Sequence, residues 1–184
     1  HLLELSSFQL EHIKQFKPDI SIILNLSPDH LDRYSNYNEY LSSKLNIIMN
    51  QDLNCTAIIN KNITITSKIN KFKLIRFEII DSNKMSVNNK IIKIIYNNNS
   101  LDSNHNKENI LAAYIVSKKM GINHNNIISS INSFKTLEHR IEKINLKSNI
   151  NYYNDSKATN LNATTAAIES IKNDIILILG GVDK

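Results

Sequence analysis

The sequence is poor in the residues that build disulfide frameworks, tight turns and aromatic platforms. Its 184 residues include one cysteine, two prolines, three glycines and no tryptophan. A single cysteine excludes a disulfide within the chain and a thiolate metal site. Cys55 lies in the apolar run CTAIIN, which indicates a reduced core residue and fits the cytoplasm. No apolar stretch approaches the ~18 residues of a membrane-spanning helix, so we expect no membrane contact.

The sequence also lacks a basic face. Its 22 basic and 17 acidic residues leave a net charge of +5, which permits binding to phosphate groups. The lysines are scattered, aromatic residues make up only 7% of the chain, and there is no basic tail. We therefore expect no nucleic-acid partner. The 41% hydrophobic content is typical of a globular protein with a real core.

Both ends of the sequence look interrupted. The chain opens at His1 in the apolar run HLLEL. It stops at DIILILGGVDK, just after a strand-like run and a Gly-Gly turn that normally leads into another element. We therefore expect the chain to be a fragment of a longer protein.

Short β-like runs alternate with helical patterns along the chain. LLEL precedes SSFQLEHIKQF, DISIILNL precedes a helix from about Asn38, and NINYY precedes ATTAAIESI. This alternation is typical of parallel α/β units. Ligands of such sheets bind at the carboxyl ends of the strands, so polar residues there are the first candidates for a site.

Further β segments are predicted in ITITS, KLIRFEII and MSVNNKIIKIIY, the last as a hairpin that turns near Asn88 and Asn89. The run NKENILAAYIVSKKMG carries an apolar helical stripe and ends at Gly121, which predicts a helix with a glycine C-cap.

A lysine interrupts the apolar face of one predicted helix. Lys44 falls in the middle of the face formed by Tyr37, Tyr40, Leu41 and Ile48. An isolated lysine here would bury its stem and keep its ammonium in water. A polar cluster lies just upstream of this helix, however, and it makes a functional role for Lys44 more plausible than a purely structural one.

That cluster is the strand end SPDHLDR, which holds Asp29, His30, Asp32 and Arg33. Taken singly, the aspartates would be turn or helix caps and His30 a hydrogen-bonded loop residue. Together with an inward lysine they indicate a site for phosphate and a hard cation. Glu4, at the end of another apolar run, fits either a first-turn acid or a ligand of Mg²⁺, and spacing alone leaves both open.

Six motifs, in this order, closely resemble those of the Mur ligases: LELSSFQLE (3–11), DHLDRY (29–34) with Lys44 downstream, HNKENILAA (105–113), EHRIE (138–142), NDSKATN (154–160) and GGVDK (180–184). Within the family, ELSSFQLE and NDSKATN together look most like the branch that adds D-glutamate. One departure is Ser103, two residues before His105, where many relatives have glycine.

The resemblance implies an α/β fold in two parts. Residues 1–137 would be the later part of a central P-loop-type ATPase domain, and residues 138–184 the start of a Rossmann-like domain that binds the amino acid. No G-x-x-x-x-G-K-[ST] loop occurs in the sequence, so we expect it upstream.

The implied activity is ATP-dependent addition of D-glutamate to UDP-N-acetylmuramoyl-L-alanine through an acyl phosphate. This reaction belongs to peptidoglycan precursor synthesis, and thus to cell-wall biogenesis, cell shape and cell division. The resemblance implies a cytoplasmic monomer that uses ATP and Mg²⁺. We expect the fragment alone to be inactive.

The resemblance also implies roles for individual residues. Those matching Mg²⁺ ligands are Glu4, His30 and Lys44, the lysine after carbamylation by CO₂. Those matching contacts to the muramoyl substrate are Ser6 and Gln9, and those matching nucleotide contacts are Asn106, Asn109, Arg140 and Asp155. Those matching the D-glutamate side are Lys157, Thr159 and Lys184. The implied catalytic group is His30, Lys44 and Arg140, with cations placed where negative charge grows.

Two other interpretations remain open. The chain could belong to another Mur-type or folylpolyglutamate synthase-like amide ligase. It could also be a non-catalytic module that binds phosphate or nucleic acid, which is compatible with the net charge of +5.

Overall fold

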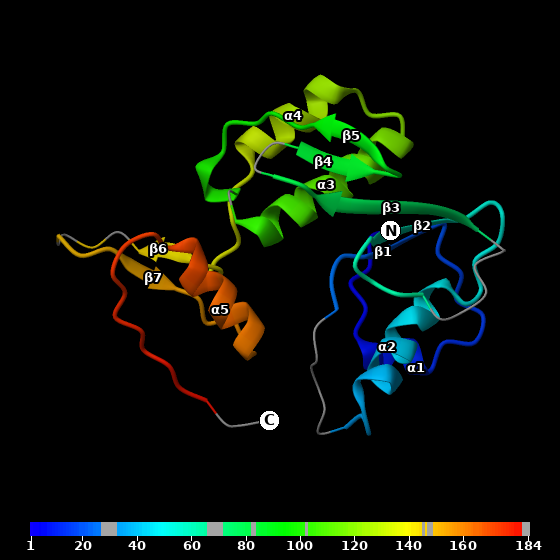
Figure 1. The fold of residues 1–184 in the computed structure, drawn as a ribbon, viewed down its shortest axis with the longest axis horizontal. Coiled ribbons are helices and arrows are strands. Elements are labelled where there is room, and N and C mark those ends of the chain that lie inside the picture. Colours follow the sequence, from blue (N-terminus) through cyan, green and yellow to red (C-terminus); the bar gives the residue numbers. More distant parts are fainter. Residues whose placement is uncertain are drawn as a thin grey trace.

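The computed structural model describes residues 1–26, 33–65, 72–81, 84–101, 103–144, 146 and 149–181. Within these ranges the strands form a five-stranded sheet in the order β1-β2-β3-β4-β5 and a separate two-stranded sheet, β6-β7 (Figure 1). The predicted α/β fold class is confirmed for the larger sheet, which carries helices on both of its faces.

The first three strands run parallel: β1 (Ile20–Ile23), β2 (Thr56–Asn60) and β3 (Lys73–Ile79). Every residue of β2 is buried, because this central strand is covered on both faces. Its side chains alternate between the two faces, so that Ile58 packs in one apolar cluster while Ala57 and Ile59 pack in the other. Cys55, which precedes β2, is a free buried thiol as predicted.

The predicted hairpin is confirmed. Strands β4 (Lys84–Val87) and β5 (Lys90–Lys93) are antiparallel, with Val87 opposite Lys90. The two residues between them, Asn88 and Asn89, have φ angles of 50° and 63°. A two-residue turn that matches strand twist needs positive φ at both positions, and asparagine tolerates it better than most residues.

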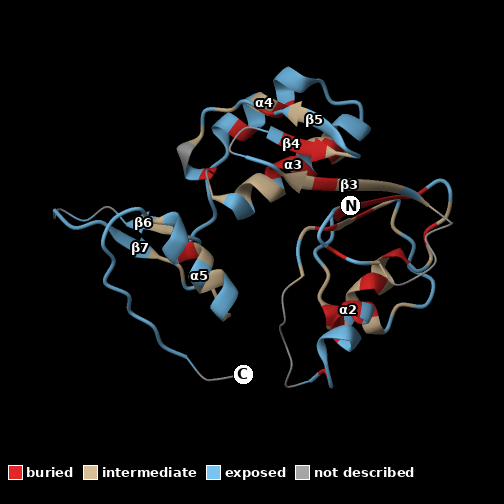
Figure 2. Cartoon of the chain, in the orientation of Figure 1, coloured by how far each residue is buried: buried red, intermediate tan, exposed pale blue. Residues whose placement is uncertain are grey.

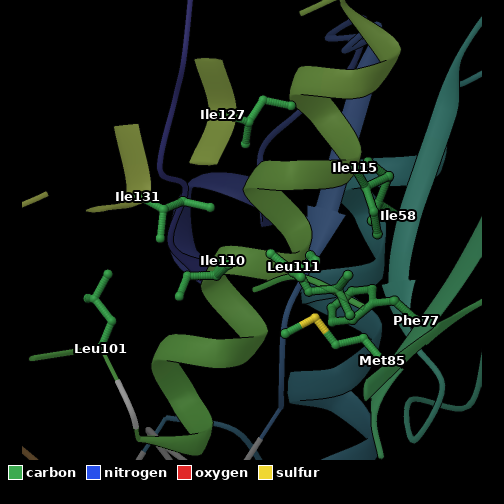
Figure 3. Packing of buried hydrophobic residues seen from close by; sticks show 10 residues of the cluster. Ile58, Phe77, Met85, Leu101, Ile110, Leu111, Ile115, Ile127 and Ile131 are labelled. Carbon is green, nitrogen blue, oxygen red and sulfur yellow. The ribbon is translucent and has the colours of Figure 1, made fainter. Parts of the chain in front are cut away.

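One face of the sheet is covered by α3 (Asn104–Lys119) and α4 (His124–Ser133). Figure 3 shows Leu111 of α3 against Phe77 and Met85 of the sheet, and Ile115 of α3 beside Ile58. Helix α3 begins after Ser103, whose side chain accepts from the Asn106 amide, so serine caps the helix directly. The helix ends at Lys119 with Met120 as its C-cap, and the predicted glycine, Gly121, follows the cap with a φ of 82°. The short helix η2 (Asn99–Leu101) precedes α3.

The opposite face is covered by α2 (Tyr37–Leu45) and η1 (Asn46–Ile48). Leu41, Leu45 and Ile48 pack there with Ile59 of β2. Helix α1 (Ser7–Glu11) packs against α2. Among the described residues, no helix is both long enough and apolar enough to cross a membrane.

The C-terminal region, residues 138–181, is built differently. It contains β6 (Glu142–Ile144), β7 (Tyr152–Asn154) and α5 (Leu161–Ser170). Strand β7 pairs antiparallel with β6, whereas its sequence pattern predicts a parallel unit. Figure 2 shows the region mostly exposed, with intermediate residues in its strands and in α5, and Ala167 is its only buried residue among those described.

Three predicted elements differ in the structure. LLEL forms no strand, and Leu2 and Leu3 are 94% and 59% exposed, because no described strand pairs with this run. The helix predicted over SSFQLEHIKQF stops at Glu11, and beyond it the side-chain amide of Asn50 donates to the carbonyls of Lys14 and Phe16, each at 3.0 Å. Residues 63–65 of ITITS are not a strand, and the rest of that run lies outside the described residues.

Candidate functional site

The residues predicted to bind a metal lie around α1 and α2. Glu4 is exposed in the segment before α1. Lys44, on α2, is half-buried, and its Nζ lies over the ring of Tyr40, 5.9 Å from the ring centre. His30 lies outside the described residues, as do Asp29 and Asp32.

A carboxylate oxygen such as that of Glu4 suits Mg²⁺, whereas the ammonium of Lys44 suits it only after conversion to a carbamate. Among the described residues, no three His, Cys, Asp or Glu side chains gather closely enough to hold a metal ion. The roles of Glu4, His30 and Lys44 in binding Mg²⁺ therefore stay predictions.

Ser6 and Gln9, predicted to contact the substrate, form a capping box at the start of α1. The Gln9 amide donates to the Ser6 hydroxyl at 3.3 Å, and the Ser6 amide donates to the Gln9 side-chain oxygen at 2.8 Å. Both side chains thus have a structural role, and their contact with substrate stays a prediction. Gln9 itself is exposed.

A carboxylate that our sequence analysis overlooked joins two of the motifs. Glu11, at the end of α1, accepts hydrogen bonds from the Arg33 guanidinium at 2.8 Å and from the Tyr34 hydroxyl. The bond from Arg33, followed by that from Tyr34, holds the pKa of Glu11 below its ordinary value, and Glu11 in turn raises the pKa of Arg33. The signal was available, because Glu11 ends LELSSFQLE and Arg33 lies in DHLDRY.

These side chains line a cleft of about 430 Å³ between α1 and α2. Its lining residues are Glu11, Arg33, Tyr34, Glu39, Ser42, Ser43 and Asn46. The cleft thus combines carboxylates, a guanidinium and hydroxyls beside the helix that carries Lys44.

A second polar group lies at the carboxyl ends of the parallel strands. Glu108 of α3 accepts from the side-chain amide of Asn60, which ends β2, at 3.0 Å, and from that of Asn25, which follows β1, at 3.3 Å. Asn60 is only 3% exposed. Sequence analysis assigned these three residues no role, although Asn60 ends an apolar run and Glu108 lies in HNKENILAA. Asn60 and Glu108 also line a cleft of about 300 Å³.

The predicted nucleotide contacts on α3 flank Glu108. Asn106 is half-buried and its side-chain amide donates to the Ser100 carbonyl at 3.3 Å. Asn109 is exposed. Both residues therefore lie on the helix that is tied to the strand ends, where ligands of parallel sheets bind.

The EHRIE and NDSKATN motifs come together in the C-terminal region. The Asp155 carboxylate accepts from the Ile141 amide at 3.0 Å, and the Lys157 amide donates to the His139 carbonyl at 3.1 Å. The side chains of Asn154 and His139 are also hydrogen-bonded, at 2.8 Å. These hydrogen bonds link the EHRIE segment directly to the NDSKATN segment.

The remaining predicted residues of this region are Arg140 and Thr159, both exposed, and Lys184, which lies outside the described residues. No hydrogen bond or ion pair between described residues joins Asn106 or Asn109 to Arg140 or Asp155. Among the described residues, the predicted site residues thus lie in three places: around α1 and α2, on α3, and in the C-terminal region.

Comparison with known proteins finds a family and several relatives that match the chain. The profile of the Mur ligase middle domain matches residues 1–168. The chain is 40% identical over 203 residues to the UDP-N-acetylmuramoylalanine–D-glutamate ligase of Christiangramia forsetii, covering 100% of this chain and 45% of that protein. It is 38% identical over 200 residues to the enzyme of the same name from Rickettsia prowazekii, covering 100% of this chain and 44% of that protein. The chain therefore spans less than half the length of these curated relatives.

Solved structures support the fold alone, because their sequence identities are low. MurF from Acinetobacter baumannii superposes with a TM-score of 0.62 at 16% identity, covering 84% of this chain and 37% of that one. A murein peptide ligase from Psychrobacter arcticus gives a TM-score of 0.56 at 17% identity, covering 84% of this chain and 35% of that one.

Proposed function

Because this chain belongs to the Mur ligase family, whose members are ligases, we propose that it is part of a MurD-type enzyme, an ATP-dependent ligase that adds D-glutamate to UDP-N-acetylmuramoyl-L-alanine. The observation that carries this proposal is the match of the whole chain, at 38–40% identity, to relatives named for that reaction. The six sequence motifs, two of them typical of the D-glutamate-adding branch, agree with it.

The proposed reaction has two steps. A carboxylate oxygen of UDP-N-acetylmuramoyl-L-alanine attacks the γ-phosphorus of ATP, and ADP leaves, which gives an acyl phosphate. The amine of D-glutamate then attacks the acyl carbon, loses a proton, and expels phosphate as the amide forms. Negative charge develops on phosphoryl oxygens in the first step and on the former carbonyl oxygen in the second, so both need fixed cations or donors.

The residues of the sheet region would serve the first step. Asn106 and Asn109 would bind the nucleotide, and Ser6 and Gln9 would orient the muramoyl substrate. Glu4, His30 and a carbamylated Lys44 would hold Mg²⁺, which when bound neutralises charge on phosphate oxygens. The tie between α3 and the strand ends supports the nucleotide assignment, because it fixes the helix that carries both asparagines.

The residues of the C-terminal region would contact the bound nucleotide and serve the second step. Arg140 would reach the ATP phosphates, and Asp155 would contact the nucleotide. Lys157, Thr159 and Lys184 would recognise D-glutamate, since ammonium and hydroxyl donors suit its carboxylates. The hydrogen bonds that link His139 to Lys157 and Ile141 to Asp155 support this assignment, because they hold EHRIE and NDSKATN as one unit.

We further propose that the complete protein works as a cytoplasmic monomer, without nucleic-acid or membrane partners, in peptidoglycan precursor synthesis. The buried free thiol of Cys55 fits a reducing compartment. The complete protein would supply the phosphate-binding loop and the other domains, so the chain by itself would not turn over substrate.

The test is ATP-dependent incorporation of labelled D-glutamate by the full-length protein, with UDP-N-acetylmuramoyl-L-alanine as acceptor. L-Glutamate, glycine and L-lysine serve as comparison substrates. We expect D-glutamate to be used with a kcat/KM at least ~100-fold above the others, since a charged and stereospecific pocket discriminates strongly. Preference for another amino acid would reassign the chain to a sister ligase, and absence of ATP-dependent ligation would overturn the proposal.

A further inference from the structure

A single carboxylate on α3 joins the carboxyl ends of two neighbouring parallel strands, β1 and β2. Glu108 uses its two oxygens separately: Oε1 accepts from the side-chain amide of Asn60 at 3.0 Å, and Oε2 accepts from that of Asn25 at 3.3 Å. Asn60 is the last residue of β2, and Asn25 lies two residues after the last residue of β1. Glu108 therefore links the helix to both strands at the edge of the sheet where ligands of parallel sheets bind.

The Asn60 side of this link is held rigidly. Asn60 is only 3% exposed, and its side-chain oxygen accepts from the Asn62 amide at 3.1 Å while its side-chain nitrogen donates to Glu108. Turning the amide group would set donor against donor and acceptor against acceptor, so its orientation is fixed. The Asn60 carbonyl also accepts from the Arg76 guanidinium of β3 at 3.1 Å, which joins the same position to the third parallel strand.

Glu108 lies at the end of α3 that carries the two asparagines predicted to bind the nucleotide. Asn106 is two residues before it, and Asn109 is the next residue. Further along the helix, Leu111 and Ile115 pack in the apolar cluster between α3 and the sheet. Apolar packing is not directional, whereas hydrogen bonds have narrow limits of distance and angle. The bonds of Glu108 therefore set how this end of α3 is rotated and shifted relative to the strand ends.

We propose that Glu108 is a positioning residue, which sets the placement of Asn106 and Asn109 relative to the carboxyl ends of β1 and β2. It acts through Asn60 and Asn25 and does not itself touch the nucleotide, because both of its oxygens are used by protein amides and a carboxylate repels phosphate. This inference rests on the proposed function, since the placement of α3 affects a ligand only if its asparagines bind the nucleotide. Misplacing a binding group by ~1 Å is enough to cost ~100-fold in rate.

The test compares Glu108→Ala with the wild type in the full-length protein. The Kd for ATP is measured by isothermal titration calorimetry, and kcat and the KM values for ATP and D-glutamate are measured by ligation. We expect the Kd and the KM for ATP to rise ~10-fold or more, because two hydrogen bonds to a charged group are lost, with the KM for D-glutamate little changed. A role in stability alone would lower the amount of active enzyme, and hence the apparent kcat, without raising the KM for ATP.

Glu78→Gln is the matched control. Glu78 and Glu108 line the same cleft of about 300 Å³, and Glu78 of β3 is ion-paired with Lys61 at 2.8 Å. The substitution removes one carboxylate charge from this cleft without touching the links of α3. We expect no rise in the Kd for ATP, because removing a negative charge does not weaken the binding of an anion.

Asn25→Ala removes one of the two links from the strand side. Asn25 is exposed, so the substitution should leave the fold intact. We expect the Kd for ATP to rise ~3-fold, and no further rise when Asn25→Ala is combined with Glu108→Ala, because both substitutions break the same bond. This variant also takes the place of Glu108→Ala in the comparison should that protein fail to fold.

The positioning role is overturned if Glu108→Ala, or Asn25→Ala in its place, binds ATP as tightly as the Glu78→Gln control. It is also overturned if Asn25→Ala weakens ATP binding further in the Glu108→Ala background, since the two residues would then act independently. The proposed function fails separately: a wild-type protein that binds ATP but ligates no D-glutamate disproves the substrate assignment, while the Kd comparison can still be made. A wild-type protein that binds no ATP overturns both.

Discussion

The sheet region, residues 1–133, and the C-terminal region, residues 138–181, both carry predicted site residues but hold them by different means. In the sheet region, α2 and α3 pack in two apolar clusters on opposite faces of the sheet, so their positions do not depend on polar contacts alone. In the C-terminal region, one residue among those described is buried, and hydrogen bonds between two short segments supply the order. Predicted site residues can therefore be supported by very different numbers of buried apolar residues.

The two regions also differ in which residue types adopt strained backbone conformations. The positive φ angles of the sheet region belong to Asn88 and Asn89, which tolerate them, and to Gly121. In the C-terminal region they fall on Gly181, at 156°, and on two non-glycine residues, His139 at 65° and Ile141 at 47°. A β-branched residue is costly in this conformation, by about 1–3 kcal/mol, so the contact from Asp155 to Ile141 must help to maintain it.

The largest expected difference between the two regions is in activity. We expect Lys44→Ala in the full-length protein to lower kcat by ~100-fold or more, because in the proposed site it removes the carbamate that would hold Mg²⁺ beside the phosphates. Lys157→Ala should instead raise the KM for D-glutamate, by ~10-fold, with a smaller effect on kcat. Steady-state kinetics with each substrate varied separates the two. Near-normal turnover of Lys44→Ala would exclude the carbamate hypothesis.

Stability provides the next largest contrast. Leu111 is fully buried on α3, whereas Ile176 is 93% exposed. We expect Leu111→Ala to lower the free energy of unfolding of the chain by about 2–5 kcal/mol, through lost burial and a residual cavity. Ile176→Ala should change it by less than about 0.5 kcal/mol. Urea unfolding followed by circular dichroism measures both, and equal effects would contradict the difference in packing.

A smaller effect is expected at the junction of EHRIE and NDSKATN. Asp155→Ala removes the acceptor of the Ile141 amide and should destabilise β6 and β7 by about 0.5–1.5 kcal/mol. Hydrogen exchange of the amides from Ile141 to Ile144 reports this directly. Asp174→Ala, in an exposed stretch of the same region, is the control. Unchanged protection of Ile141 in Asp155→Ala would show that the strained turn holds without this contact.

The smallest effect concerns pH. The Arg33 and Tyr34 hydrogen bonds lower the pKa of Glu11 from its ordinary value of 4.5, so the folded state binds its proton less readily than the unfolded state. The stabilisation is therefore present above pH 4.5 and is lost as pH falls through the lower folded pKa. Thermal melting from pH 6 to pH 3 measures it, and Glu11→Gln should flatten the curve. Added salt should weaken the dependence, because the pair is near the surface.

Local patterns predicted much of the sheet region. Apolar runs bounded by turn residues indicated β1, β3 and the β4–β5 hairpin, and Gly121 marked the end of α3. Helix α4 was missed because its sequence, HNNIISSINS, is rich in asparagine and serine, which have low helix propensity. Its signal was the four-residue spacing of Ile127 and Ile131, which face the core together.

The site was less predictable than the fold, since its contacts join distant residues. Glu11 and Arg33 are 22 positions apart, and Asn60 and Glu108 are 48 apart. Periodicity shows which residue types lie at a strand end or in a helix turn, but not which of them pair across such distances. The same limit explains LLEL, whose pattern fits a strand that has no neighbour among the described residues.

The run IILIL, residues 175–179, has a consequence for handling the protein. Ile176 and Ile178 are 91–93% exposed, and the five residues carry no charge, proline or glycine. Short segments of this kind pair readily with identical copies and are recognised causes of precipitation and inclusion-body formation. The purified chain should therefore lose solubility with increasing concentration. Replacing Ile176 and Ile178 with lysine should delay light scattering without altering the folded sheet region.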